Sequence, residues 1–257
     1  MKKFLAIVLA AIMICVSFVA CSSKTDDKSN NDSQQATLTL ATNAEFPPYE
    51  YKEGDEVIGI DAEVAKAIAD KLGMKLEIVD TKFDAIIHGV QSGKYDMGMA
   101  GMTVTPEREE SVAFSDSYAT GIQSIIVKED SDIKSVDDLS SSSKIGVQLG
   151  TTGDIYAKDD FGADAVAEMD KGADAVQALI AGKVDCVIID NEPAKAFVKA
   201  NEGLKILDTA YAQEDYAICF AKDNTELKDK VNAALKELIA DGTVQKIVDK
   251  YINADAQ

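Results

Sequence analysis

Three short segments combine polar side chains with glycine, each at a point where an apolar run ends. The first contains Ala100, Gly101 and Thr103 and continues to Arg108. Pro106 suits the first turn of a helix with Thr105 as its N-cap, so Arg108 is expected in that turn. Its positive charge there opposes the helix dipole, and an anion nearby would resolve the conflict. That anion is either a neighbouring glutamate, Glu107, Glu109 or Glu110, or a bound carboxylate.

The second and third segments follow two later apolar runs. Gly150, Thr151 and Thr152 join the run KIGVQL to an expected helix and can present amides and hydroxyls to an anion at its N-terminus. The same turn also reads as a purely structural one. Asp190 ends the run VDCVIID and either caps the next helix or accepts hydrogen bonds from an ammonium group.

These groups together describe the two ends of an α-amino acid. The planar fork of Arg108, the amides near Gly101 and the Thr103 hydroxyl suit a carboxylate, and Asp190 suits an ammonium group. Phe46 and Phe83 could flank an aliphatic, amide or guanidinium side chain, although either ring alone also fits an ordinary core position.

The sequence contains none of the common motifs of enzyme active sites that we considered. The chain has one histidine, His88, in the helical run FDAIIHG, where a structural role is the expected one. No Gly-x-Ser-x-Gly elbow, phosphate-binding loop, His-Glu-x-x-His helix or Cys-x-x-Cys pair occurs. We therefore expect no catalytic residue, no metal and no cofactor.

The elements that must position these residues alternate between apolar strands and amphipathic helices. Strands are expected at LTLATN, LEIVD and YDMGMAGM, and helices at DAEVAKAIADKLG, ended by Gly73, and FDAIIHGVQSG. A second series follows SIIVKED: KIGVQLG, a helix from about Asp154, AVAEMD, ADAVQALIAG, VDCVIID and EPAKAFVKA. Such interleaving predicts an α/β fold with largely parallel sheets, in two similar lobes. Two covering helices separated by Asp241 and Gly242 are expected at the end.

The first 36 residues are expected to lie outside the folded part. Residues 1–20 have a basic start, an apolar run and a small residue before Cys21, the layout of a secretory signal peptide. A membrane-spanning helix is the alternative, but the apolar run is at the short limit for crossing a bilayer. Residues 22–36, SSKTDDKSNNDSQQA, contain no large apolar side chain and predict a disordered tether.

The net charge of the chain limits the classes of binding partner, and the positions of its cysteines predict their chemical state. Removal of Lys2 and Lys3 with the signal peptide takes the formal charge from −19 to −21, which disfavours nucleic acid as a partner. Cys186 and Cys219 each lie inside an apolar run and are predicted to be buried free thiols, although a disulfide is compatible with an exported protein.

The chain as a whole resembles the polar amino-acid binding proteins of ABC importers, bacterial extracellular solute-binding proteins of family 3. The resemblance is carried, in order, by ATNAEFPPYEY, GIDAEVAKAIADKLG, AGMTVTPERE with VAFSDSYA, VQLGTTG, VIIDNEPA and DGTVQKIVDKY. It covers nearly the whole mature chain, and the combination is highly specific although no single segment is. Residues 18–21, FVAC, similarly resemble a lipobox, which implies lipidation of Cys21.

The resemblance implies a two-lobed clamshell of the type II periplasmic-binding-protein class, with two crossover strands. The expected boundaries are 37–122 plus 218–257 for the first lobe and 123–217 for the second. By analogy, Arg108 holds the ligand carboxylate with Thr103, Thr152 and the backbone at Ala100 or Gly101, and Asp190 holds the ammonium. Phe46 and Phe83 flank the side chain. Asn43 stands where relatives that bind cationic side chains often have an acid, and Glu45 nearby could restore that preference.

The resulting prediction is a lipid-anchored, monomeric receptor on the outer side of the cell membrane. It captures a polar L-amino acid, the identity of which the sequence leaves open, and delivers it to a membrane-embedded importer. Three alternatives remain at this stage: a dehydratase on the same fold, a sensor module, for which no signalling segment follows Gln257, and a purely structural lipoprotein.

Overall fold

The computed structural model describes residues 35–208 and 210–252, and Gln35–Gln257 is one compact unit. The signal peptide predicted for residues 1–20, the lipidation of Cys21 and nearly all of the predicted tether lie outside the described residues. Within the described part, no helix has the length and apolar character that a membrane span requires.

The first sheet has the strand order β5-β1-β6-β14-β7 and is mixed: β1 pairs in parallel with β5 and β6, and β14 is antiparallel to β6 and β7. In β1 the side chains of Leu38 and Leu40 are both buried. They lie on the same face of the sheet because alternate residues of a strand point to the same side. We call this sheet and the helices around it lobe 1. Its strands are β1 (Thr37–Thr42), β5 (Lys75–Asp80), β6 (Met97–Gly98), β7 (Val112–Phe114) and β14 (Cys219–Ala221).

The second sheet has the order β10-β9-β11-β8-β12, with β13 paired to β8 beside this path. β9 pairs in parallel with β10 and β11, whereas every partner of β8 is antiparallel. We call this sheet and its helices lobe 2. Its strands are β8 (Ala119–Lys128), β9 (Ile145–Gln148), β10 (Val166–Met169), β11 (Cys186–Asp190), β12 (Leu204–Ile206) and β13 (Ala212–Tyr216).

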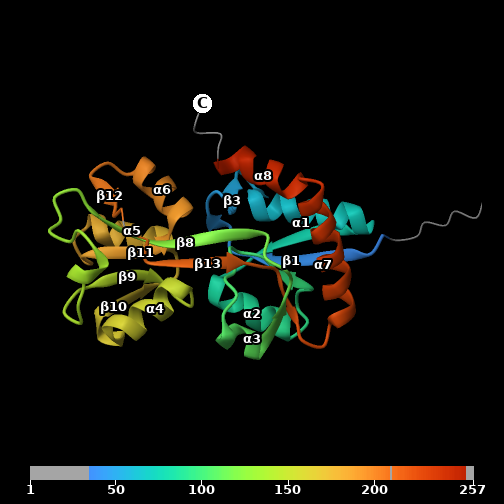
Figure 1. Cartoon of the computed structure of the whole chain (residues 1–257), viewed down its shortest axis with the longest axis horizontal. Helices are drawn as coiled ribbons and strands as arrows, with labels where there is room; N and C mark the ends of the chain where they lie inside the picture. The colour runs from blue at the N-terminus through green and yellow to red at the C-terminus, as the bar shows by residue number, and fades with distance from the viewer. Residues whose placement is uncertain (1–34, 209, 253–257) are drawn as a thin grey trace, which may run out of the picture. The chain divides into compact units, whose positions relative to one another are not determined.

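β8 and β13 run side by side between the two groups of elements (Figure 1). Gly121 of β8 leaves room for the Tyr216 side chain, because a Cβ atom at position 121 would lie 2.2 Å from the Tyr216 hydroxyl oxygen. We retain 37–122 plus 218–257 and 123–217 as proposed lobe boundaries. The membership of the two sheets supports them, since only β8 crosses a proposed boundary.

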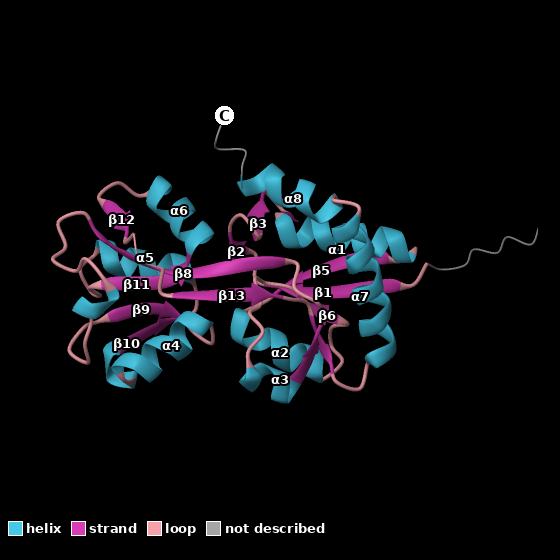
Figure 2. Cartoon of the chain, in the orientation of Figure 1, coloured by secondary structure: helices cyan, strands magenta, loops and turns pink. Residues whose placement is uncertain are grey.

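Helices cover both sheets, as the cyan ribbons of Figure 2 show. In α1 the buried residues Ile60, Val64 and Ile68 recur every four positions and form one face, and the helix ends at Gly73 with a φ of 67°. The helices of lobe 1 are α1 (Ile60–Leu72), α2 (Phe83–Gln91), α3 (Pro106–Ser111), α7 (Thr225–Ala240) and α8 (Thr243–Ile252). Those of lobe 2 are α4 (Thr152–Phe161), α5 (Gly172–Ile180) and α6 (Asn191–Ala200).

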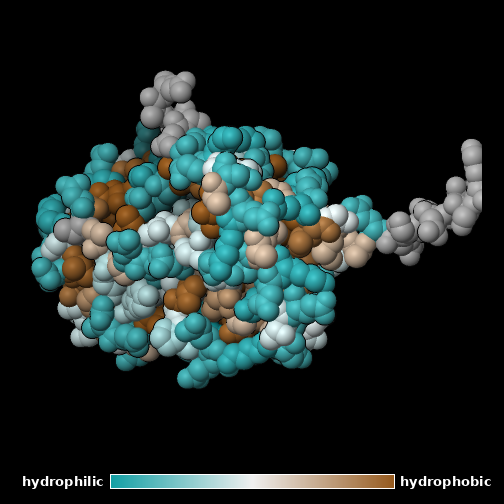
Figure 3. All heavy atoms as spheres, turned by 45° about the vertical axis from the view of Figure 1, so that its right-hand side comes forward, coloured by the Kyte–Doolittle hydropathy of each residue, from teal (hydrophilic) through white to brown (hydrophobic). Residues whose placement is uncertain are grey.

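Three smaller features complete the described chain. A three-stranded antiparallel sheet has the order β2-β3-β4, formed by β2 (Glu45–Phe46), β3 (Glu50–Glu53) and β4 (Glu56–Ile58). Two short 3-10 helices occupy Val136–Asp138 and Ala163–Ala165. On the face seen in Figure 3, hydrophilic residues predominate and hydrophobic ones are scattered among them.

The two cysteines of the folded part are free and buried, as predicted. Burial raises the pKa of both thiols to about 12, so they pack as small apolar side chains rather than as nucleophiles.

Candidate functional site

A cavity lies where residues of both lobes meet. Most of its lining residues come from the carboxyl ends of strands and the segments after them, where open α/β sheets bind ligands. Its lining residues are Asn43, Phe46, Glu50, Phe83, Ala100, Gly101, Thr103, Arg108, Gln148, Thr151, Thr152 and Asp190. Every residue that the sequence predicts to contact the ligand therefore lines this cavity, except Gly150. The carbonyl of Gly150 accepts a hydrogen bond from Arg108.

Arg108 is held in the cavity wall by the local structure that its neighbours dictate. Thr105 caps α3 by accepting a hydrogen bond from the Arg108 amide at 3.2 Å, and Pro106 occupies the first turn, as expected. The guanidinium donates through Nη1 to the Thr103 carbonyl at 2.8 Å and through Nη2 to the Gly150 carbonyl at 3.0 Å. Its central carbon lies 5.4 Å from the centre of the Phe83 ring.

The charge of Arg108 is not neutralised by its neighbours in sequence. Glu107, Glu109 and Glu110 are exposed, and no carboxylate among residues 35–208 and 210–252 forms an ion pair with Arg108. Only 6% of Arg108 is exposed, and this burial lowers its pKa, while the charge of Glu214 partly opposes the shift. A buried cation bonded only to carbonyls creates a strong demand for an anion in the cavity.

Asp190 lies in the cavity wall at the end of β11 and is held by two donors. Gln123 Nε2 donates to Asp190 Oδ2 at 2.7 Å, and the Tyr216 hydroxyl donates to Oδ1. The carboxylate makes no side-chain cap to α6, so the capping role considered from the sequence is wrong. Burial, and then the charge of Glu214, raise the pKa of Asp190 to about 7.

Gln123 ties the acidic side of the cavity to the turn before α4. Its Nε2 also donates to Glu214 Oε2 at 3.0 Å and to Thr152 Oγ1 at 3.3 Å. Thr151 caps α4 by accepting from the Asp154 amide at 3.3 Å, and the Gly150 amide donates to Asp154 Oδ2 at 3.0 Å. Gly150 has a φ of 78°, a conformation that glycine adopts without strain.

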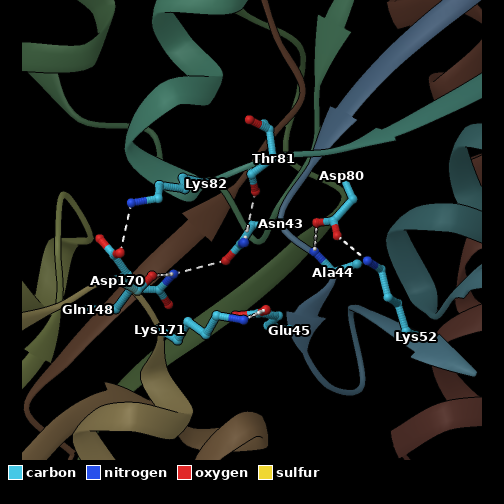
Figure 4. A network of polar contacts seen from close by, with 10 residues as sticks. All are labelled: Asn43, Ala44, Glu45, Lys52, Asp80, Thr81, Lys82, Gln148, Asp170 and Lys171. Atoms are coloured by element: carbon cyan, nitrogen blue, oxygen red, sulfur yellow. Dashed lines mark hydrogen bonds and ion pairs between the residues drawn. The ribbon is translucent and has the colours of Figure 1, made fainter.

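Polar contacts also join the lobes beside the cavity (Figure 4). Asn43 Nδ2 donates to the Thr81 carbonyl at 2.9 Å, and its Oδ1 accepts from Gln148 Nε2 at 2.9 Å. Lys82 pairs with Asp170 at 2.7 Å, and Lys171 pairs with Glu45. Glu45 is thus occupied by an ion pair and does not line the cavity, so the preference for cationic ligands suggested for it gains no support.

Phe46 and Gly101 approach each other closely on the lobe 1 side. Gly101 has a φ of 52°, and a Cβ atom there would lie 2.8 Å from Phe46 Cε1. The Gly101 amide donates to Asp61 Oδ2 at 3.0 Å, which fixes the backbone of the loop that carries Ala100 and Thr103. The aromatic ring and the loop therefore form one preorganised wall.

Sequence reasoning missed Glu50 and Gln148, which line the cavity, and Gln123, Glu214 and Tyr216, which hold its acidic side. Glu50 and Gln148 belong to the quoted segments FPPYEY and VQLGTTG, so their place beside Phe46 and Gly150 was the available signal. Gln123 and Glu214 lie on β8 and β13, whose pairing the sequence pattern did not reveal.

No group of residues suited to a metal ion occurs among the described residues, and His88 is exposed on α2. The arrangement offers a buried cation, a buried acid with donors around it, hydroxyls at a helix N-terminus and aromatic walls. It is suited to binding a zwitterion.

Comparisons with known proteins show which family the chain resembles. The family of bacterial extracellular solute-binding proteins, family 3, matches residues 38–254. The arginine-binding extracellular protein ArtP of Bacillus subtilis (strain 168) is 36% identical over 263 residues, covering 99% of this chain and 100% of ArtP. The ABC transporter arginine-binding protein 1 of Escherichia coli (strain K12) is 30% identical over 257 residues, covering 98% and 99%. A solved structure of an ancestral arginine-binding protein bound to glutamine is 43% identical, with a TM-score of 0.80, covering 85% of this chain and 98% of that one.

Proposed function

The chain belongs to the bacterial extracellular solute-binding proteins, family 3, and on that premise we propose that its cavity grips one polar L-amino acid by both ends. It is a solute-binding protein for amino-acid uptake by an ABC transporter, with the type II periplasmic-binding-protein fold, and not an enzyme. The dehydratase, sensor and structural alternatives are therefore set aside.

The observation that carries the site proposal is the pair of charges across the cavity. Arg108 is a buried cation without a carboxylate partner, and Asp190 is a buried acid that can accept an ammonium group. The ligand carboxylate would pair with the guanidinium and with the hydroxyls of Thr103 and Thr152, and the α-ammonium with Asp190. Because the charges come from different lobes, the ligand stabilises the closed state in proportion to its higher affinity for that state. Closure is a hinge motion on the order of microseconds to milliseconds.

The remaining lining residues would surround the ligand side chain. The rings of Phe46 and Phe83, with the amides of Asn43 and Gln148, make a wall that is partly apolar and partly polar. Ala100, Gly101, Gly150 and Thr151 would shape the carboxylate end through their backbone. The names of the relatives favour arginine, and one of them was solved with glutamine bound, so we propose a ligand with a long polar side chain.

A thermal-shift screen of the purified chain against the twenty common amino acids and cystine tests this function. We expect a clear rise in melting temperature with at least one ligand that has a long polar side chain, because binding to the folded state stabilises it. Titration calorimetry should then give a one-to-one complex. A complete lack of response would refute the proposal.

We also propose that Cys21 carries a lipid and holds the protein at the outer side of the cell membrane as a monomer, delivering its ligand to a membrane-embedded importer. Residues 18–21, FVAC, support this, and residues 22–36 would form the tether. The full-length Cys21→Ser variant should be expressed in a bacterial host. We expect it in the medium, whereas the wild type should be found in the membrane fraction. An unchanged distribution would contradict the anchor.

A further inference from the structure

Glu50 is an acid in the cavity wall that has no role in gripping a zwitterion. It begins β3, is 1% exposed and lines the cavity. Neither of its carboxyl oxygens accepts a hydrogen bond from another described residue. An ionised carboxylate is strongly disfavoured in such surroundings, so the group must carry a proton or face a cation.

A neighbouring acid explains how Glu50 is accommodated without a ligand. Asp61 of α1 accepts hydrogen bonds from the Gly101 amide at 3.0 Å and from the Tyr118 hydroxyl at 2.7 Å. Burial, and then the charge of Asp61, raise the pKa of Glu50 well above its usual value. The pKa of Asp61 rises only to about 6, because burial is opposed by the bonds that it accepts. Glu50 is therefore the proton holder of the pair.

The charged and titratable groups around this pair come from several elements. They are Tyr49 beside Glu50, Asp61 of α1, Tyr118 before β8, Asp190 of β11, Glu192 of α6, Glu214 and Tyr216 of β13, and Arg108 of α3. Arg108 is the one cation among the described residues that line the cavity, whereas Glu50 and Asp190 are both acids. A bound zwitterion would pair its two charges with Arg108 and Asp190, which leaves no positive charge for Glu50.

From this balance we propose that a ligand with a cationic side chain binds in exchange for the Glu50 proton, whereas a neutral ligand leaves Glu50 protonated. In the exchange the O–H bond of the Glu50 carboxyl breaks, the proton passes to solvent, and the carboxylate remains as counter-charge to the ligand. One site thereby accepts both ligand classes and favours the cationic one increasingly as the pH rises. The inference rests on the proposed amino-acid function and adds to it the selectivity of the site.

The test compares arginine with citrulline, which has nearly the same shape and a neutral side chain. Titration calorimetry at neutral pH in buffers of different protonation enthalpy counts the protons released on binding. We expect arginine to release up to about one proton more than citrulline. The ratio of the citrulline Kd to the arginine Kd should also rise with pH. Equal release and a ratio independent of pH would overturn the inference.

Glu50→Gln keeps the size and the neutral state of the side chain and removes the exchangeable proton. We expect it to abolish the difference in proton release and to weaken arginine binding more than citrulline binding. Glu53→Gln, an exposed acid at the other end of β3, is the matched control and should leave both unchanged. An unchanged difference in Glu50→Gln would assign the proton elsewhere and overturn the proposal.

Two further measurements keep the outcomes separable. If Glu50→Gln does not unfold cooperatively, Asp61→Asn replaces it and should also reduce the extra proton release, because the negative charge that raises the pKa of Glu50 is removed. If the wild-type chain binds no amino acid, the proposed function itself fails. If it binds arginine and citrulline with the same proton count, only the exchange at Glu50 fails.

Discussion

Arg108 of α3 donates to the carbonyl of Gly150, 42 residues later in the chain and in the other lobe, at 3.0 Å. The same guanidinium donates to the Thr103 carbonyl of its own lobe at 2.8 Å. It therefore spans the cavity even before a ligand is considered. A ligand carboxylate beside this guanidinium would accept a charge-assisted hydrogen bond from it. The ligand would then be bound by a side chain that already connects the two lobes.

Replacement of Arg108 by lysine should weaken ligand binding strongly. The ammonium of lysine carries its three donors on one tetrahedral nitrogen and cannot reproduce the planar fork of arginine. Lysine keeps the charge but loses the paired donors, and a hydrogen bond to a charged group is worth about 1.5–3 kcal/mol, so we expect the Kd to weaken at least about tenfold. Titration calorimetry measures the loss, and a cooperative thermal transition shows that the fold is intact. Lys94→Ala, an exposed change, is the control. Near-normal affinity in Arg108→Lys would refute the assignment.

Asp190 should make the affinity for neutral amino acids depend on pH. Its pKa is raised to about 7, so the carboxylate becomes protonated as the pH falls through that value and can no longer pair with an ammonium group. We expect the Kd of a neutral ligand to rise below pH 7 by up to about tenfold per pH unit. Asp190→Asn should bind weakly and lose this dependence. A pH-dependent affinity that persists in Asp190→Asn would point to a different acid.

The same raised pKa has a consequence for the stability of the ligand-free protein. The folded state holds the Asp190 proton up to about pH 7, whereas an unfolded aspartate loses it near pH 4. In this interval the folded state thus binds more protons than the unfolded state does. The contribution of Asp190 to the free energy of unfolding therefore decreases as the pH rises from about 4 to about 7. Thermal melts across this range should show a smaller decrease for Asp190→Asn. Identical pH profiles for the two proteins would contradict the assignment.

The two strands that connect the lobes, β8 and β13, show which parts of the site could not be predicted from the sequence. Thr105, Pro106 and Arg108 were predictable because a cap and a proline fix the first turn of a helix locally. The strand β13 was not predicted, because its residues AQEDY show no apolar alternation. Its identity as a strand comes from pairing with β8, a contact that no local pattern contains. Gln123 and Glu214 are diagonal neighbours across that pairing and were missed for the same reason.

Gln123 should prove essential to the acidic side of the cavity. Its amide donates to Asp190 and Glu214 at 2.7 and 3.0 Å, and Gln123→Leu would leave both buried acids without that donor. We expect a loss of about 1–3 kcal/mol in the free energy of unfolding, together with weaker ligand binding. Denaturant unfolding and calorimetry measure the two effects. Gln213→Leu, an exposed change on β13, is the matched control, and equal stability of the two variants would refute the role.

The ion pairs beside the cavity should favour the closed state only weakly. Lys82–Asp170 and Lys171–Glu45 join the two lobes, and both lysines are more than half exposed, so water and salt screen them. Lys82→Ala or Lys171→Ala should therefore raise the ligand Kd by no more than a few-fold at low salt.

The control is Lys52→Ala, because Lys52 pairs with Asp80 within lobe 1 at 2.5 Å and has a similar exposure. Its removal changes the same kind of charge but breaks no contact between the lobes, so the ligand Kd should stay constant. Added salt should weaken binding by the wild type toward the level of the two inter-lobe variants, since screening acts on the exposed pairs. If Lys52→Ala lowers the affinity as much as Lys82→Ala does, net charge rather than lobe closure explains the effect.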